Sequence, residues 1–239
     1  MRYKITKFDE LDSTNSEAAR GDYRHGDIVT AQWQSQGRGQ RGNRWVSKAG
    51  DNLMFSLVIE PKEITVYEQF RVSLLASLSA SDAIGVMGVE CKLKWPNDLY
   101  VGDKKIGGIL IEHNSMGEYI SRSIIGIGIN VNQEEFDRNL PNPTSLRCHQ
   151  TSHSNITPCS LLEEFCKAFT RRYSQSLEEL SEDYKARLWR ATGCHRFKDK
   201  DGEFTGEISN INPCTGEITL SLGDSSKRSY FFKEVEFIL

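Results

Sequence analysis

The hydrophobic pattern of the first part of the chain predicts two strands and one long helix. Residues 27–34 and 53–59 are short runs rich in β-branched and other apolar side chains, which is typical of strands. Residues 67–86 instead space their large apolar side chains at helical intervals, and we expect this buried helix to end near Gly85. The pattern favours a strand-rich mixed fold.

The central part of the chain continues with predicted strands. Residues 91–95 form a short apolar run. Residues 99–101 and 105–112 flank a Gly-Asp turn signal, so we expect a hairpin there. Residues 119–131 predict a further strand that contains two glycines.

Two capping-box patterns mark predicted helix starts. Thr14 and Glu17 have the required spacing and precede two alanines, so we expect a short helix from Thr14. Ser160 and Glu163 repeat the pattern before an amphipathic segment, and a further helix is expected over residues 177–189.

The last part of the chain changes character. Short strand-like runs at residues 203–211, 217–222 and 228–237 are separated by turn residues. We therefore expect residues 1–189 to form a large α/β domain and residues 190–239 to form a small β-barrel.

Composition limits the function classes without choosing among them. Of the 239 residues, 38% are hydrophobic and 26% are charged, as in ordinary globular proteins. The net charge of −3 gives no sign of affinity for nucleic acid or membranes. No apolar run approaches the ~20 residues of a membrane span, and the N-terminus lacks an apolar signal core, so we expect a cytoplasmic protein.

The cysteines are scattered and form no C-x-x-C pair, so we expect reduced, mostly structural thiols. Cys148, His149, His153 and Cys159 share one polar stretch. A zinc site and a plain surface loop are both compatible with that stretch, and we favour the loop. We therefore predict no metal held by a side-chain cluster.

Residues 34–45, QSQGRGQRGNRW, combine three glycines with three arginines, and we call this segment the Arg-Gly loop. Glycines let the backbone approach a ligand closely, and arginines offer planar forks for phosphate and carboxylate oxygens. A solvated basic turn is the alternative interpretation. The glycines also spell G-x-G-x-x-G, but no adequate helix follows, which excludes a dinucleotide fold, and the missing Gly-Lys-Ser/Thr excludes a P-loop.

The loop is one of five motifs that occur in a fixed order. They are DSTN at residues 12–15, GRGQRGNRW at 37–45, KWPND at 94–98, KIGGIL at 105–110 and GIGIN at 126–130. Together these motifs resemble the biotin protein ligase family from about residue 8 to residue 146. The tail of the chain resembles the small C-terminal barrel of that family.

The resemblance implies a fold, a reaction and a set of ligands. The fold is an α/β catalytic domain of the class II aminoacyl-tRNA-synthetase-like type, with a mixed, largely antiparallel sheet flanked by helices, followed by an SH3-like barrel. The reaction joins biotin and ATP, with Mg²⁺, into biotinyl-5′-AMP. The biotinyl group then passes to a lysine of a biotin carboxyl carrier protein.

The resemblance also implies catalytic residues. Joining a carboxylate to ATP brings two anions together, so fixed cations lower the barrier. Lys105 resembles the family lysine that contacts the biotin carboxylate and the α-phosphate, and Arg38 resembles a charge clamp. Asp98 resembles an acidic residue required for chemistry, and three roles stay open for it: orienting Lys105, assisting Mg²⁺ together with Asn130, or deprotonating the incoming lysine. Without the motif, Lys105 is a surface lysine and Asp98 a turn aspartate.

Two sets of binding residues follow from the same motifs. The biotin set is Ser13, Thr14, Asn15, Gln34, Gly37, Arg38, Gly39, Lys105, Gly108, Gly126 and Gly128. The ATP and adenylate set is Gln40, Arg41, Arg44, Trp45, Asn97, Lys105 and Asn130. Thr14 is alternatively only a helix cap, and Trp45 is alternatively a core side chain.

The chain departs from the family pattern at two positions of the loop. Family members often carry arginine where this chain has Gln40 and Asn43. The arginine at the first position is associated with retaining the adenylate. Gln40 keeps hydrogen bonding but loses a charge, so the strength of retention stays open, with Arg41 and Arg44 as neighbouring cations.

Three other functions compete with the ligase. A lipoate or octanoate transferase shares the fold, but the Arg-Gly loop together with KWPND argues against it. A DNA-binding repressor needs an N-terminal helix-turn-helix domain of roughly sixty residues, and the first motif already begins near Ser13, so we expect no nucleic-acid partner. An inactive binding module is disfavoured by Lys105, Asp98 and Asn130. The acceptor carboxylase, and the choice between monomer and homodimer, stay open.

Overall fold

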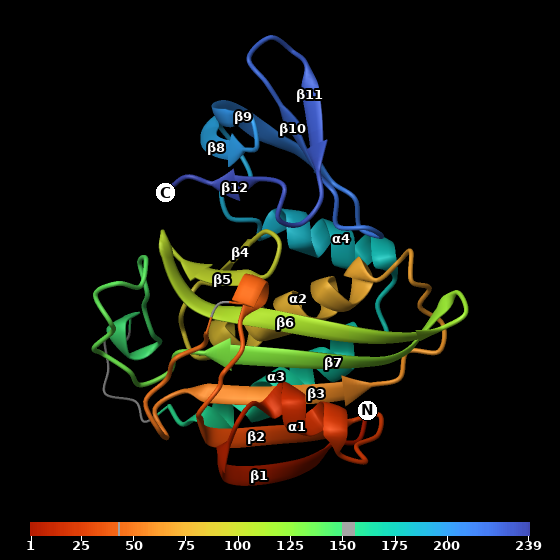
Figure 1. Cartoon of the computed structure of the whole chain (residues 1–239), viewed down its shortest axis with the longest axis vertical. Coiled ribbons are helices and arrows are strands. Elements are labelled where there is room, and N and C mark those ends of the chain that lie inside the picture. Colours follow the sequence, from red (N-terminus) through yellow and green to blue (C-terminus); the bar gives the residue numbers. More distant parts are fainter. Residues whose placement is uncertain (43, 150–155) are drawn as a thin grey trace.

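A seven-stranded sheet flanked by helices forms the larger part of the molecule, and a second sheet of five strands follows at the C-terminal end (Figure 1). The computed structural model describes residues 1–42, 44–149 and 156–239. None of the helices in these ranges is both long and apolar enough to cross a membrane.

The large sheet has the order β1-β2-β3-β7-β6-β5-β4. Only β1 and β2 run parallel, and the other neighbouring strands are antiparallel. The mixed, largely antiparallel sheet expected from the sequence is therefore confirmed. The strands are β1 (Lys4–Leu11), β2 (Asp27–Gln34), β3 (Leu53–Ile59), β4 (Lys92–Lys94), β5 (Asp98–Val101), β6 (Lys104–Met116) and β7 (Tyr119–Ile129).

Helices cover the two faces of this sheet unequally. Side chains along a strand alternate between faces, so β3 sends Phe55 and Leu57 into the main core and Val58 to the opposite face. The main core lies under α2 and α3, with α4 packed on α2, and the short α1 covers Val58 on the other side. The helices are α1 (Thr14–Arg20), α2 (Phe70–Val86), α3 (Pro158–Arg172) and α4 (Leu177–Ala186).

The C-terminal sheet has the order β11-β10-β9-β8-β12. Among the residues placed here no pairing joins β11 to β12, and this small second sheet is consistent with the SH3-like fold expected from the sequence. The boundary near residue 190 stays a prediction. The strands are β8 (His195–Asp199), β9 (Gly202–Ile211), β10 (Ile218–Ser221), β11 (Lys227–Tyr230) and β12 (Glu236–Phe237).

The C-terminal sheet packs directly on the larger unit. The Trp95 indole Nε1 donates a hydrogen bond to the Gly216 carbonyl at 2.8 Å, and the Phe70 amide donates to the Cys214 carbonyl at 3.0 Å. The ring of Phe232 contacts both Phe70 and Trp95. One hydrophobic cluster therefore runs through both units, which fixes the C-terminal sheet against the start of α2 and the β4–β5 connection.

The short helix expected from Thr14 begins there, but its predicted capping box is absent, because the N-cap is Ser13 and no side chain caps it. The second predicted helix start was placed wrongly. Helix α3 begins at Pro158, and its capping box joins Thr157 to Ser160 instead of Ser160 to Glu163. Proline suits the first helical position, because its missing N–H has no partner to lose there.

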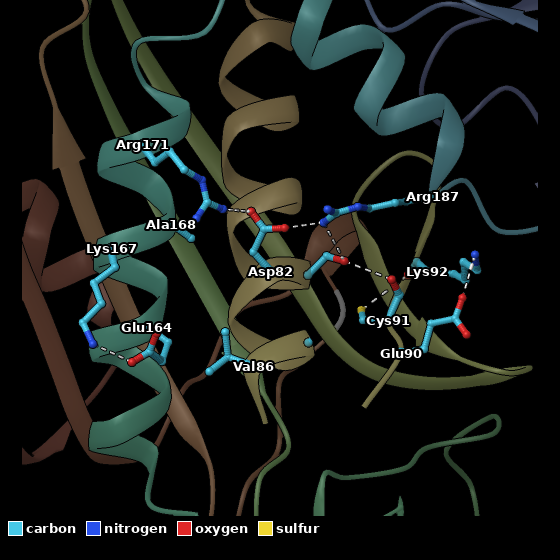
Figure 2. Close-up of a pocket in the computed structure, with 12 residues that line it drawn as sticks. Asp82, Val86, Glu90, Cys91, Lys92, Glu164, Lys167, Ala168, Arg171 and Arg187 are labelled. Atoms are coloured by element: carbon cyan, nitrogen blue, oxygen red, sulfur yellow. Dashed lines mark hydrogen bonds and ion pairs between the residues drawn. The ribbon is translucent and has the colours of Figure 1, made fainter. Parts of the chain in front are cut away.

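A single carboxylate ties three helical segments together on the face of the molecule that carries α2 and α3 (Figure 2). Asp82 of α2 accepts hydrogen bonds from Arg171 and Arg172 of α3 and from Arg187 just after α4. Arg172 is 4% exposed and also donates to Asp183 at 2.8 Å. Burial raises the pKa of the Asp82 carboxyl, but the bonds from Arg172 and Arg187 outweigh it and lower that pKa below its ordinary value.

Asp82→Asn should lower the unfolding free energy by about 3 kcal/mol, because it removes the charge that the buried Arg172 shares with Arg187 and leaves Arg172 only the part-exposed Asp183. The melting temperature should fall by about 6–12 °C in a thermal scan. A carboxyl whose folded-state pKa is lowered stabilises the fold above its ordinary pKa of 3.8, and this contribution is lost as the pH falls below that value. The difference between wild type and variant should therefore shrink below about pH 4.

Asp22→Asn is the matched control, because the Asp22 side chain is 85% exposed and pairs only with exposed Arg24. It should leave the melting temperature within about 1 °C. Equal melting temperatures for wild type and Asp82→Asn at neutral pH would show that the arginine cluster does not join the helices.

Candidate active site

A narrow slot lies between the Arg-Gly loop and the face of the sheet that carries α1. In Figure 1 the segment after β2 crosses in front of β6, and its residues share the slot lining with β6 and β7. Most of the residues singled out from the five motifs meet there. The lining is Ser13, Thr14, Asn15, Gln34, Arg38, Gly39, Gln40, Trp45, Asn97, Lys105, Gly108, Ile109, Leu110, Gly126, Ile127 and Gly128.

The floor of the slot is backbone, because glycines occupy the strand positions that face it. Gly108 of β6 pairs with Gly128 of β7 in the sheet register. A Cβ atom at Gly128 would lie 2.6 Å from the indole of Trp45, and one at Gly126 would overlap the side-chain amide of Asn15. The glycines are therefore required for close approach rather than for an unusual backbone conformation.

One end of the slot is a buried polar cluster. The Ser56 hydroxyl, which is fully buried on β3, lies 2.8 Å from the Thr14 hydroxyl and 2.6 Å from the Asn15 side-chain oxygen. The Thr14 amide donates to the Gln34 side-chain oxygen at 2.7 Å. The structure thus brings Ser13, Thr14 and Gln34 together at one point, as the motifs predict.

The other end of the slot holds an ion pair. Lys105 Nζ lies 2.6 Å from Asp98 Oδ1, and it is about one third exposed. The Lys105 amide donates to the Asn142 carbonyl at 2.8 Å, and its carbonyl accepts from the Thr144 amide at 2.9 Å. Backbone bonds therefore fix the lysine, and Asp98 fixes the direction of its ammonium group. Asn97 is also held, since its side-chain amide donates to the Ile109 carbonyl at 2.7 Å.

Arg38 lies away from this ion pair, although the sequence interpretation grouped it with Lys105. Its guanidinium pairs with Glu112, and Glu112 also accepts a hydrogen bond from Asn15 at 2.8 Å. The Lys105 ammonium group lies beside Gly108 of the same strand. Glu112 lies four residues beyond Gly108 along β6. At a rise of about 3.3 Å per residue, roughly 13 Å of strand separate the two anchoring points.

Two further predicted residues lie beside the slot without lining it. The Asn130 side chain is buried, and its amide donates to the Thr144 carbonyl at 2.9 Å. Gly37 contributes its carbonyl, which accepts from the Trp45 amide at 2.9 Å and shapes the loop. In this conformation both residues support the lining rather than face a ligand.

The remaining loop cations are not placed in the slot. The Arg44 guanidinium donates to the Ser35 carbonyl at 2.9 Å, on the outer side of the loop. Arg41 belongs to the short 3₁₀ turn Gln40–Gly42, but its side chain is outside the described part of the chain, as is Asn43. The strength of adenylate retention with Gln40, which the sequence leaves open, is therefore not decided by the described residues.

Two residues of the site were missed by sequence reasoning. Ser56 sits within an apolar strand, and Glu112 lies two residues beyond the KIGGIL motif. Their partners are 41 and 97 residues away in the sequence, so no local spacing could have indicated them. A polar residue inside an otherwise apolar strand was the one available signal, at Ser56.

The stretch considered for zinc does not gather its ligands in the described part. The Ser145 hydroxyl donates to the Cys148 sulfur at 3.3 Å, and the His149 ring lies 2.8 Å from the Thr144 hydroxyl. His153 falls outside the described residues. Across residues 1–42, 44–149 and 156–239, no three His, Cys, Asp or Glu side chains are placed to hold a metal ion.

Comparisons with known proteins agree with this geometry. Residues 7–130, more than half of the chain, match the biotin/lipoate A/B protein ligase family. The chain therefore belongs to the biotin/lipoate A/B protein ligase family. Its relatives include a biotin–[acetyl-CoA-carboxylase] ligase of Paracoccus denitrificans, 31% identical over 69% of this chain and 70% of that protein. Because its relatives in this family include biotin–[acetyl-CoA-carboxylase] ligases, the chain is an enzyme of the biotin protein ligase group.

Longer relatives and solved structures extend the comparison to nearly the whole chain. The bifunctional ligase/repressor BirA of Bacillus subtilis is 29% identical over 96% of this chain, which spans 73% of that protein. The biotin protein ligase of Aquifex aeolicus, solved in complex with biotin and ATP, superposes with a TM-score of 0.79. The superposition covers 97% of both chains at 24% identity, which shows that the fold is shared.

Gly128→Ala should displace Trp45 and loosen the Arg-Gly loop, because the new methyl group would overlap the indole. Overpacking of this kind costs about 1–3 kcal/mol, so trypsin should cleave the loop arginines about fivefold faster or more than in wild type. Limited digestion followed by mass spectrometry measures this rate directly.

Gly85→Ala is the matched control, since a Cβ at Gly85 of α2 meets nothing within 4 Å. It should leave the cleavage rate unchanged and slightly stabilise the helix. If Gly128→Ala is cleaved at the wild-type rate, the loop is not held by the packing of Trp45 on β7.

Proposed function

We propose that this enzyme joins biotin and ATP into biotinyl-5′-AMP and then transfers the biotinyl group to a lysine of a biotin carboxyl carrier protein or domain. The observation that carries the proposal is the slot itself. It has buried polar groups at one end, a glycine floor along its length and the Lys105–Asp98 ion pair at the other end. Biotin is a small ring with polar edges and a tail that ends in a carboxylate, so it matches this order of polar, apolar and charged groups along the slot.

In the proposed complex, the ureido ring of biotin lies at the end formed by Ser13, Thr14 and Gln34. Hydroxyl and amide groups there can bond the ring oxygen and nitrogens, while the glycine backbone and Leu110 contact its apolar parts. The slot now has only 60 Å³ of free volume, about the share of two water molecules. Biotin therefore enters only when the Arg-Gly loop shifts. The return of the loop would then exclude water from biotinyl-5′-AMP, which is a reactive mixed anhydride.

The first chemical step is proposed to occur at the ion pair. A carboxylate oxygen of biotin attacks the α-phosphorus of ATP, and the bond from that phosphorus to the bridging oxygen breaks, so pyrophosphate leaves. Lys105 brings a positive charge to the point where the two anions meet, which is the main electrostatic obstacle. In this step Asp98 orients Lys105, and the 2.6 Å pair is the geometric basis for this first of the three roles that the sequence left open.

The second step transfers the biotinyl group. The neutral amine of the acceptor lysine attacks the carbonyl carbon of biotinyl-AMP, the bond to the phosphate oxygen breaks and AMP leaves. The amine gives up a proton in this step, and the Asp98 carboxylate is the acidic side chain placed at that end of the slot to accept it.

The residues around the slot fit an adenylate. Trp45 Nε1 is buried and has no hydrogen-bond partner among the described residues, so it is free to donate to a ligand. Gln40 and Asn97 add amide groups to the same lining. Bound with the phosphates, Mg²⁺ would neutralise charge on the leaving pyrophosphate, and Asp98 is the carboxylate in reach of that end. The Asn130 amide is already bonded to Thr144.

Lys105→Ala should abolish biotin-dependent release of pyrophosphate from ATP, with a loss of about 100-fold or more in rate. The cause is the removal of the slot-lining ammonium group that pairs with Asp98, and the fold should stay intact. A coupled phosphate assay with biotin present and absent measures the effect.

Lys104→Ala is the matched control, because Lys104 is the exposed neighbour on β6 and should leave the rate unchanged. Full activity of Lys105→Ala would remove Lys105 from its proposed role. Wild-type activity with lipoate and none with biotin would contradict the proposed function and favour a lipoate enzyme of the same family.

A further inference from the structure

The Glu112 carboxylate bridges two elements that close the slot from different sides. One oxygen pairs with the Arg38 guanidinium of the Arg-Gly loop, and the other accepts from the Asn15 amide of α1 at 2.8 Å. We propose that Glu112 is a positioning residue that holds Arg38 and Asn15 in the arrangement that binds biotin. This inference rests on the proposed function.

On the side of α1, hydrogen bonds to Ser56, Leu110 and Glu112 allow one orientation of the Asn15 side-chain amide. Its side-chain oxygen lies 2.6 Å from the Ser56 hydroxyl, and its side-chain nitrogen donates to the Leu110 carbonyl at 3.3 Å and to Glu112. Asn15 is 3% exposed, so a flipped amide would place a buried oxygen against two acceptors. Glu112 thereby helps fix the side chain that rests on the glycine floor at Gly126.

On the side of the loop, Glu112 decides where Arg38 points. The Arg38 backbone pairs with Arg44 in a short antiparallel bridge, which fixes the main chain and leaves the direction of the guanidinium to its side-chain contacts. Among the described residues, the other such contact is a long one, 3.5 Å to the Ser16 hydroxyl. A single carboxylate on the rigid strand β6 therefore anchors a side chain that its own loop would leave free.

The chemistry requires a carboxylate rather than an amide at position 112. Both neighbours are donors, and the two carboxylate oxygens each accept from one of them. Glutamine has the same shape but a single acceptor, so its NH₂ group would face either the guanidinium or the Asn15 NH₂ group. The pair is 44% and 37% exposed, so it adds little to folding stability, and its effect should appear in binding through preorganisation of the loop.

The test compares Glu112→Gln with Glu118→Gln, an exposed glutamate in the turn between β6 and β7. Both full-length variants are assayed for pyrophosphate release over ranges of biotin and ATP. For Glu112→Gln we expect the KM for biotin to rise about tenfold, the scale of one lost charge-assisted hydrogen bond. The KM for ATP, kcat and the melting temperature should stay near wild type, and Glu118→Gln should match wild type throughout.

A double-mutant cycle with Arg38→Gln separates positioning from a general structural effect. Because Glu112 acts through both Arg38 and Asn15, the rise in the biotin KM of the double variant should be clearly smaller than the product of the rises in the two single variants. Fully multiplicative losses, an unchanged KM for biotin in Glu112→Gln, or equal rises in both KM values with a lowered melting temperature would each overturn the inference. Failure of the proposed function is distinguishable, because wild type itself would then release no pyrophosphate with biotin.

Discussion

The contact between two side chains and the bare backbone of β7 is the constraint on which the site depends. Asn15 and Trp45 rest where Gly126 and Gly128 have no side chains, and a methyl group at either position would displace them. The neighbouring positions of the same strand, Ile125 and Ile127, point into the core under α2 and α3. One strand thus supplies both the packing that holds the sheet and the cleared surface that forms the slot.

The electrostatics of the slot follow from that geometry. Two carboxylates on neighbouring strands each pair with a cation that lines the slot, Asp98 of β5 with Lys105 and Glu112 of β6 with Arg38. Lys105 belongs to a strand whose backbone is bonded on both sides, whereas Arg38 belongs to a loop with glycines beside it. The end proposed for chemistry is therefore rigid. The end proposed to admit and cover the ligand can rearrange when one ion pair opens.

The sequence predicts most elements here because their burial follows a simple period. β2 and β3 have the predicted bounds, since their apolar residues mark them off from polar neighbours. β1 was not predicted: as an edge strand it leaves most side chains exposed or half-buried, and backbone pairing with β2 defines it. β8 buries Phe197 alone, which is too little for a recognisable strand pattern. The capping residues of α1 and α3 were predicted wrongly because neighbouring hydroxyl residues offered equivalent caps, and for α3 this also misplaced the helix start.

The site was predicted residue by residue from motifs, but its internal contacts were not. The motifs indicate Asn15 and Arg38, which line the slot, yet their shared partner Glu112 is far away in the sequence and lies outside every motif. This long-range contact holds Arg38 away from Lys105, and spacing within a motif does not encode it.

The most direct test of the account is a crystal structure of this enzyme with a non-hydrolysable analogue of biotinyl-AMP. We expect the bicyclic ring to lie in the slot with its ureido group beside Ser13, Thr14 and Gln34, and the acyl phosphate to lie at Lys105. An analogue bound outside this slot, or bound with Lys105 still paired to Asp98 and away from the phosphate, would contradict it.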